Sequence, residues 1–380
     1  MTRAGKTEKR GGRRLRRFVG SAFVFVFLAA LTYSLVAGGG KLDLSGAKRA
    51  LAGLRGIERA DEFVYTPGYD SAFADLDGVF VTAGTLGYEV FDVDGRQLAH
   101  ESSTISEPTV ASSGGYAVIY DAGGFLVRLI DSAGVSVAIE PEYEIISASV
   151  NGSGWLALCT RESGGYKGGV TVYAADGAMK YKWYSAQGYI MSAALSRDNR
   201  ELAVLSLNDT GGRITFLKLQ SEQVQAAFDL ADGVILDIKY TPDGRLLAVA
   251  ESSLITVDGA GTGVVVRDFA DKHLGGWAIG DDGLTALLLL DYGIGDAGVL
   301  ETYGAGGEAL GETRTDSRCV SLSVNGGAAV LWRDRLCVYD ASLGLKSEFE
   351  DVSNVASVVA RADGSVLAIG HGVATVYGDG

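Results

Sequence analysis

Three charged residues of this chain could do chemistry together if the fold brings them to one place: Glu107, Asp237 and Lys239. Two carboxylates and an ammonium group can bind a polar ligand through charge-assisted hydrogen bonds, or can exchange protons with a substrate. His273 could join Glu107 and Asp237 in such an acid-base role. The same residues could equally be packing groups that form salt bridges or bind water. Which of these roles the residues have depends on where the strands and turns that carry them place their side chains.

The segment Met179-Lys-Tyr-Lys-Trp-Tyr184 is a second candidate, because it places aromatic side chains beside lysines. Tyr and Trp anchor many protein interfaces, which makes Tyr181 and Trp183 candidate partner-binding residues. The alternative is that these rings pack inside the fold while the lysines face solvent.

Motifs of enzymes and metal proteins are missing from the sequence. The histidines His100, His273 and His371 are isolated, and no HExxH, G-x-S-x-G or G-x-x-x-x-G-K-[ST] pattern occurs. Asp75-Leu-Asp77-Gly78 and Asp92-Val-Asp94-Gly95 resemble the start of a calcium loop but lack its third acid and its closing Glu. Asp-Gly is also typical of tight turns. We expect no catalytic set, no metal site and no cofactor.

Charge is distributed unevenly along the chain. The 380 residues contain 33 Lys plus Arg and 47 Asp plus Glu, a net charge of −14. Residues 1–17 hold eight of the basic residues and one acid, so the remainder carries 25 basic and 46 acidic residues, net −21. A domain this acidic repels nucleic acid and anionic lipid surfaces. We therefore expect no nucleic-acid partner.

Residues 18–37, FVGSAFVFVFLAALTYSLVA, are uncharged and predict a transmembrane helix, because 20 helical residues span about 30 Å. The basic tail over 1–17 precedes this run, so the positive-inside rule places the N-terminus in the cytoplasm and the rest of the chain outside, on a single-pass cell-membrane protein. The alternative is a cleaved signal peptide ending near Val36-Ala37-Gly38, although the run exceeds the usual apolar region of roughly 7–15 residues. Residues 38–61 are expected to form a juxtamembrane stalk.

From residue 70 onward the sequence repeats a pattern of short predicted strands around a tight turn. Its turn residues are Asp77, Ser113, Gly152, Asp198, Asp243, Asp282, Asn325 and Asp363. The intervals between them average about 41 residues. A period near 40 built from strands and turns is typical of a β-propeller, whose four-stranded blades need neighbours to cover both faces. The fold class is therefore all-β, an eight-bladed propeller over residues 62–380.

The ends of the repeated region predict how the ring closes. The last unit ends at Tyr377 after three strands, and Glu62-Phe-Val-Tyr-Thr66 is a strand without another place. This N-terminal strand can complete the last blade and so remove an open sheet edge. The alternative is seven blades and a separate hairpin, because the units at Ser113 and Gly152 match the repeated pattern only weakly.

With Arg13-Arg-Leu-Arg-Arg17, the following helix and the repeated Asp-Gly turns, the chain resembles a family of uncharacterised Gram-positive membrane-anchored β-propeller proteins. The units are also similar to quinoprotein-like and WD-type repeats. However, the Trp-Asp signature is missing, Gly-His occurs once at Gly370-His371, and no tryptophan docking pattern for a quinone cofactor is present. The resemblance implies no activity and transfers no functional residue.

Two functions remain open from the sequence. The first is a membrane-anchored, extracytoplasmic scaffold or ligand-binding module with an envelope protein or cell-wall partner. The second is an extracytoplasmic hydrolase or lyase that acts at the channel mouth through Glu107, Asp237 and His273. Fold alone does not decide between them.

Overall fold

The computed structural model describes residues 62–66, 68–221, 223–293 and 295–378. They belong to a compact unit, Glu58–Gly380, which is separate from Met1–Ile57. The expected tail, membrane helix and stalk over residues 1–61 lie outside the described residues. Within the described residues, no helix is long and apolar enough to cross a membrane.

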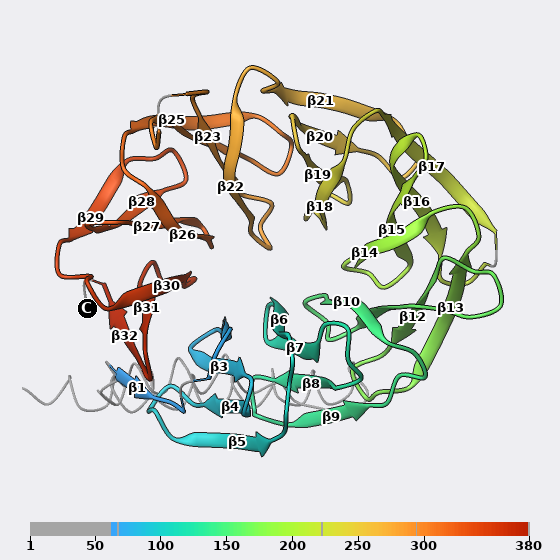
Figure 1. Ribbon diagram of the computed structural model, residues 1–380, viewed down its shortest axis with the longest axis horizontal. Helices are drawn as coiled ribbons and strands as arrows, with labels where there is room; N and C mark the ends of the chain where they lie inside the picture. Colours follow the sequence, from blue (N-terminus) through green and yellow to red (C-terminus); the bar gives the residue numbers. More distant parts are fainter. Residues whose placement is uncertain (1–61, 67, 222, 294, 379–380) are drawn as a thin grey trace, which may run out of the picture. The chain divides into compact units, whose positions relative to one another are not determined.

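The described residues form eight four-stranded antiparallel sheets around a central axis (Figure 1). The chain is thus an all-β, eight-bladed propeller, as the repeat predicts, and the seven-bladed alternative is wrong. The strands of blades 1 to 4 are β2 (Ala72–Leu76), β3 (Val79–Gly84), β4 (Gly87–Phe91), β5 (Gln97–Ser102), β6 (Pro108–Ser113), β7 (Tyr116–Asp121), β8 (Val127–Asp131), β9 (Ser136–Ile139), β10 (Ile145–Val150), β11 (Leu156–Thr160), β12 (Gly168–Tyr173), β13 (Met179–Ser185), β14 (Tyr189–Leu195), β15 (Glu201–Asn208), β16 (Gly211–Lys218) and β17 (Val224–Ala231).

Blades 5 to 8 continue the pattern, with one exception in the last. Their strands are β18 (Ile235–Tyr240), β19 (Leu246–Ala250), β20 (Ser253–Val257), β21 (Gly263–Asp268), β22 (His273–Ile279), β23 (Thr285–Leu290), β24 (Gly298–Tyr303), β25 (Ala309–Thr315), β26 (Cys319–Val324), β27 (Gly327–Trp332), β28 (Leu336–Asp340), β29 (Leu345–Phe349), β30 (Val355–Ala360), β31 (Val366–Gly370), β32 (Val373–Tyr377) and β1 (Glu62–Val64). β1, from the start of the domain, is the outer strand of blade 8 and pairs with β32.

The second strand of each blade lies between neighbouring blades and reads as an apolar run. All five residues of β19, Leu-Leu-Ala-Val-Ala, are buried. The side chains on its two faces join different clusters, since Leu246 and Ala248 pack with blade 4 and Leu247 and Val249 pack with blade 6. A strand covered on both faces needs such a sequence. The core of the propeller is therefore a series of layers between blades.

Polar contacts join the inner strands of neighbouring blades. Ser147 and Ser149 of β10 donate hydrogen bonds to the carbonyl oxygens of Met191 and Ala193 of β14, at 2.8 and 2.5 Å. These two serines of an innermost strand thus bond blade 3 to blade 4. The turns that follow these strands use glycine where the backbone requires it, as at Gly244, with φ of +84°.

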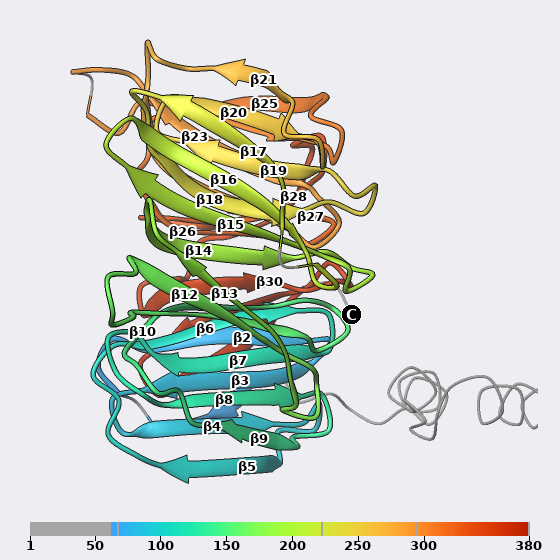
Figure 2. The ribbon, with the colours of Figure 1, turned by 90° about the vertical axis from the view of Figure 1, so that its right-hand side faces the viewer.

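Two opposite faces of the propeller follow from the alternation of strand direction. The turn face carries the connections from first to second strand and from third to fourth strand. The loop face carries the connections from second to third strand and from the fourth strand to the next blade. β1 runs from the turn face to the loop face, and β32 ends at the turn face, on the right in Figure 2.

Candidate functional site

Asp237, one of the predicted site residues, lies on the inner strand β18 and bonds to the next blade. The indole Nε1 of Trp277, on β22, donates a hydrogen bond to Asp237 Oδ2 at 3.1 Å. A β-bulge between Ile235 and Asp237 interrupts the strand register at this point, and bulges re-aim side chains. Burial raises the pKa of Asp237, and the Trp277 hydrogen bond opposes this shift. One carboxylate oxygen is thus used to hold blades 5 and 6 together.

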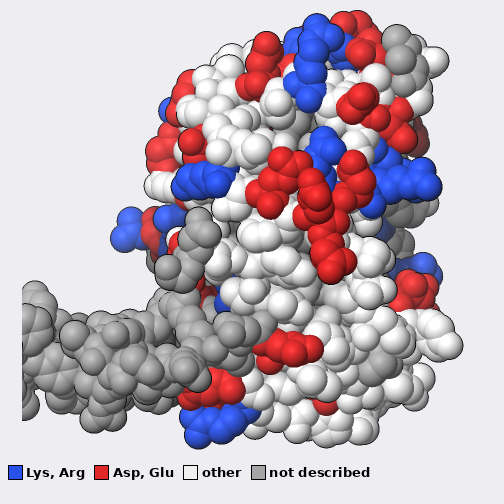
Figure 3. All heavy atoms as spheres, turned by 90° about the vertical axis from the view of Figure 1, so that its left-hand side faces the viewer, with Lys and Arg blue, Asp and Glu red and all other residues white. Residues whose placement is uncertain are grey.

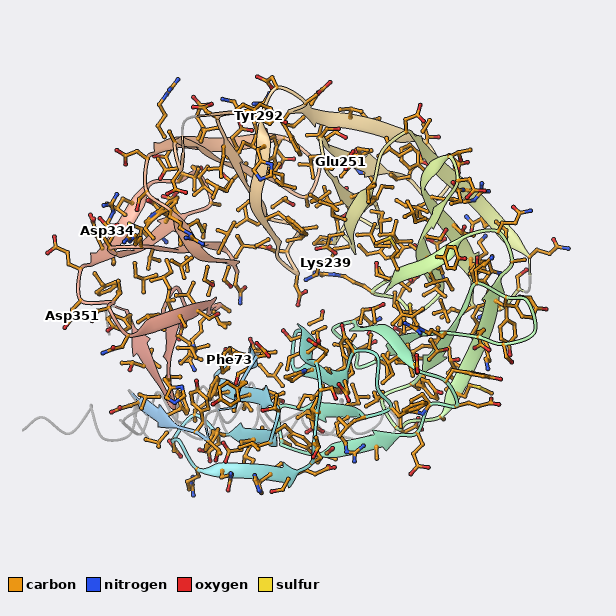
Figure 4. The ribbon with its side chains drawn as sticks, in the orientation of Figure 1. Phe73, Lys239, Glu251, Tyr292, Asp334 and Asp351 are labelled. Atoms are coloured by element: carbon orange, nitrogen blue, oxygen red, sulfur yellow. The ribbon has the colours of Figure 1, made fainter. Side chains whose placement is uncertain are left out.

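Lys239 lies two residues further along β18 and points into the central opening of the ring (Figure 4). Its Nζ donates a hydrogen bond to the carbonyl oxygen of Ile279 at 3.2 Å. The same atom is 2.7 Å from Asp281 Oδ1. The ammonium group is therefore neutralised by an acid of blade 6.

Asp281 connects blades on opposite sides of the axis. Its Oδ2 accepts a hydrogen bond at 2.7 Å from the backbone N–H of Gly114, 167 residues away, in the first turn of blade 2. Its carbonyl oxygen accepts one from Arg197 of blade 4. Blades 2 and 6 are four apart in a ring of eight, so this residue spans the channel at the turn face. We call Asp281, Lys239, Arg197 and Gly114 the axial bridge.

The turn that carries Asp281 is held by its own sequence. Asp282 Oδ1 accepts a hydrogen bond from the N–H of Leu284 at 3.0 Å, and Gly283 has a φ of +85°. A Cβ at Gly283 would also lie 2.6 Å from the Ala305 side chain. Burial by itself would raise the pKa of Asp281, but the Lys239 charge and the hydrogen bonds from Lys239, Gly114 and Ser113 hold it below the usual range.

We expect Asp281→Asn to lower the free energy of unfolding by about 1 kcal/mol at neutral pH. The amide keeps an oxygen for Gly114 but loses the charge facing Lys239, and both side chains are about one third exposed, at 35% and 31%. Because the folded pKa of Asp281 is lowered, its contribution is present above the ordinary value near 3.9 and is lost as the pH falls through the folded value. Urea unfolding of both proteins across this range tests the expectation, and a difference that persists in acid would contradict it.

Glu107 and His273 do not join Asp237 and Lys239 in the structure. Glu107 immediately precedes β6 instead of lying on an inner strand, and it is exposed at the loop face. His273 is the exposed first residue of β22. Of the suggested set, Asp237 and Lys239 share the inner strand β18, and the acid that contacts Lys239 is Asp281. Whether Glu107, Asp237 and Lys239 bind a ligand stays a prediction.

Tyr181 and Trp183 lie on β13, the outer strand of blade 3, and are half-buried against the core between blades 3 and 4. Tyr181 donates a hydrogen bond to the carbonyl oxygen of Ser221 at 3.1 Å. This geometry corresponds to the packing alternative for both residues. Their neighbour Tyr184 is exposed and stacks on Tyr166, with ring centroids 4.8 Å apart.

Every exposed aromatic side chain of the described residues lies at the loop face. Tyr69 and Phe125 are in loop-face connections and are 84% and 55% exposed. Tyr189, the first residue of β14, is 62% exposed. The complete set, which we call the aromatic face, is Tyr69, Phe125, Tyr166, Tyr184, Tyr189 and Tyr292.

A pocket of about 500 Å³ lies at the outer part of blades 5 and 6, lined in part by Arg267, Glu301 and Tyr303. Arg267 donates two hydrogen bonds to Glu301, at 3.0 and 2.8 Å, and Tyr303 adds one at 2.5 Å. Burial would raise the pKa of Glu301, but these hydrogen bonds hold it below its usual range. Blades 1 and 2 carry the same contact with the charges exchanged, Glu101 with Arg128. The pair in the pocket is therefore a blade-to-blade contact.

The comparisons with known proteins agree with this architecture. A family model for a family of unknown function, DUF5711, matches residues 60–363, most of the chain. The chain belongs to the DUF5711 family. No curated protein sequence matches it.

Solved structures similar to this DUF5711 chain are propellers. The C-terminal WD40 domain of Sif2 has a TM-score of 0.61 at 11% identity, covering 85% of this chain and 98% of that domain. BamB from Moraxella catarrhalis has a TM-score of 0.52 at 16% identity, covering 84% and 96%. At these identities the similarity shows the fold alone.

Sequence reasoning missed both the axial bridge and the aromatic face of this DUF5711 protein. The signal for the bridge is the doubled acid in Gly280-Asp281-Asp282-Gly283, where the corresponding turns at Asp243 and Asp363 have one acid. The signal for the aromatic face is the alternation of strand direction. Successive connections lie on alternate faces of the propeller, so each loop can be assigned to a face once the four strands of a blade are known.

Proposed function

We propose that this protein is a membrane-tethered scaffold that binds a protein partner through the aromatic face of its propeller, outside the cytoplasm. The observation that carries the proposal is the gathering of the exposed aromatic side chains on one face. Tyr and Trp are enriched at protein interfaces because a large apolar ring and a polar tip bury well against a partner.

The course of the chain supports the choice of this face. Glu62 enters the propeller at the turn face, and β32 ends there too, so the aromatic face is directed away from both ends of the domain. A domain tethered through its N-terminal segment would leave this face free for a partner. The basic residues of 1–17 and the uncharged run over 18–37 support the tether and the orientation.

The geometry of the axis gives no comparable support to an enzyme. Asp237 bonds to Trp277, and Lys239 pairs with Asp281. Glu107 and His273 are exposed, and within the described part of the chain their side chains form no hydrogen bond or ion pair with Asp237 or Lys239. Groups that are used to join blades are not poised to exchange protons with a substrate.

Crosslinking on intact cells with a membrane-impermeant, amine-reactive reagent tests both parts of the proposal. The wild-type chain should be joined to its partner, because an outside propeller is accessible to the reagent. Replacing Phe125 and Tyr189 by alanine should reduce capture about tenfold or more, as expected when interface anchors are lost. The matched control replaces the turn-face residues Val135 and Leu345, 56% and 54% exposed, by alanine and should leave capture unchanged.

Each result separates the two parts. Capture only with a membrane-permeant reagent would place the propeller inside and contradict the orientation. Equal capture by the wild-type and Phe125→Ala/Tyr189→Ala chains would contradict the role of the aromatic face.

A further inference from the structure

We propose that the aromatic face recognises a basic protein segment, whose Lys and Arg side chains lie over the exposed tyrosine rings and pair with the acids around them. This inference rests on the proposed function and names the chemistry of the partner. Two independent features of the loop face carry it: the way its rings already hold cations, and the sign of its charge.

Two tyrosines of this face contact ammonium groups within the structure itself. Lys167 Nζ lies 4.9 Å from the ring centroid of Tyr189 and 3.3 Å from its hydroxyl oxygen. Lys182 Nζ lies 4.9 Å from the centroid of Tyr184. Such cation–π contacts form because the face of an aromatic ring carries negative electrostatic potential. The geometry that a basic partner would use is therefore already present twice.

The rings remain available to a second cation. Tyr189 is 62% exposed with Lys167 beside it. Tyr69 and Tyr292, at 84% and 66%, have no such lysine within the described residues. Figure 4 shows Tyr292 on the outer part of the ring. Together with Phe125, these three rings are spread over blades 1, 2, 4 and 6. This spacing suits an extended segment with several basic side chains.

The charge around these rings is negative. Exposed acids at the loop face that form no ion pair with a described residue include Glu107, Glu140, Glu251, Asp271, Asp296 and Asp351. The exposed bases there without an acidic partner in the described ranges are Lys167, Arg314, Arg318 and Arg333. Figure 3 shows acidic side chains grouped on the flank of the ring as well. Complementary charge raises the association rate and excludes acidic partners, because like charges repel.

The test uses the purified full-length chain and three fluorescent peptides of equal length: alternating lysine and glycine, alternating glutamate and glycine, and alternating serine and glycine. Fluorescence anisotropy should show binding of the lysine peptide only, and binding should weaken as salt is added. Binding of the glutamate peptide instead would assign the face to an acidic partner and overturn the inference.

Substitution of the rings separates recognition from simple attraction to an acidic domain. Tyr69→Leu, Tyr189→Leu and Tyr292→Leu each remove a ring and leave the net charge and an apolar side chain. Each should weaken binding of the lysine peptide roughly two- to fivefold, the value of an exposed cation–π contact. Val135→Leu at the turn face is the control and should have no effect. Three ring variants that bind like the wild-type chain would overturn the inference.

Acid substitutions complete the test with a matched change of charge. Glu107→Gln and Glu140→Gln at the loop face should weaken binding more than Glu308→Gln, an exposed acid in a turn-face connection. Equal effects at the two faces would show attraction to the whole domain and overturn the inference. The crosslinking result distinguishes this outcome from failure of the proposed function, since a partner captured through Phe125 and Tyr189 leaves the binding function in place.

Discussion

Phe63→Ala is expected to lower the free energy of unfolding by about 3–5 kcal/mol, the range for loss of a buried phenylalanine. Phe63 is 1% exposed, and its ring lies 5.4 Å from that of Phe80 and 6.4 Å from that of Phe91, both in blade 1. β1 pairs with β32 over three residues only. The side chain of Phe63 therefore contributes much of what holds the closing strand in place.

Val64→Ala is the matched control, because Val64 is the next residue of β1 and is 73% exposed. Its effect should stay within about 0.5 kcal/mol. Chemical denaturation of the three full-length proteins measures both values. Closely similar midpoints for Phe63→Ala and Val64→Ala would show that ring closure does not depend on the packing of β1.

Arg361→Met should lower the free energy of unfolding by about 3–5 kcal/mol, because it leaves the buried carboxylate of Asp75 without its cation. This pair joins blade 8 to blade 1, where β1 also closes the ring. Arg361 Nη2 lies 2.8 Å from Asp75 Oδ2, and the two side chains are only 5% and 4% exposed. Adding Asp75→Asn to Arg361→Met removes the unpaired charge and should restore part of the loss. Arg335→Met, which breaks partly exposed pairs with Asp334 and Glu348, should cost less than about 1 kcal/mol.

The pH dependence of the Arg361→Met variant gives a second readout. Burial is the main cause that raises the pKa of Asp75, and the Arg361 charge opposes it. Without Arg361 the carboxyl takes up a proton more readily in the folded protein than in the unfolded chain. The deficit of this variant should therefore be smallest below about pH 4 and should grow as the pH rises through the folded pKa. A deficit of the same size in the double variant at neutral pH would contradict the role of the unpaired charge.

The sequence predicts the propeller well because its determinants are local. Turn residues such as Asp243 and Gly244 return in every well-matched unit, and buried second strands such as Leu246–Ala250 are apolar throughout. These patterns define the number of blades. The strand over Glu62–Val64 follows from the number of strands, since the last repeated unit has only three and its blade needs a fourth.

The candidate site was harder to predict, because its contacts join distant blades. Asp281 and Gly114 are 167 residues apart in the sequence. The repeated pattern of strands and turns does not predict a contact across the axis. Tyr181 and Tyr184 are equally aromatic in sequence, yet one packs between blades and the other faces solvent. That difference depends on the register of β13 and on the packing of blade 4 against it.

The order of synthesis gives the closing strand another meaning. Tyr65, beside β1, bonds to Gly370, 305 residues later. At about 5–20 residues per second, the ribosome needs roughly 15–60 s to make the chain between them. During that interval β1 has no partner strand, while earlier blades can already fold from neighbouring segments. The ring can therefore close only after the ribosome has synthesised β32. A chain that stops before β32 leaves an unpaired strand edge, and such an edge favours aggregation and proteolysis.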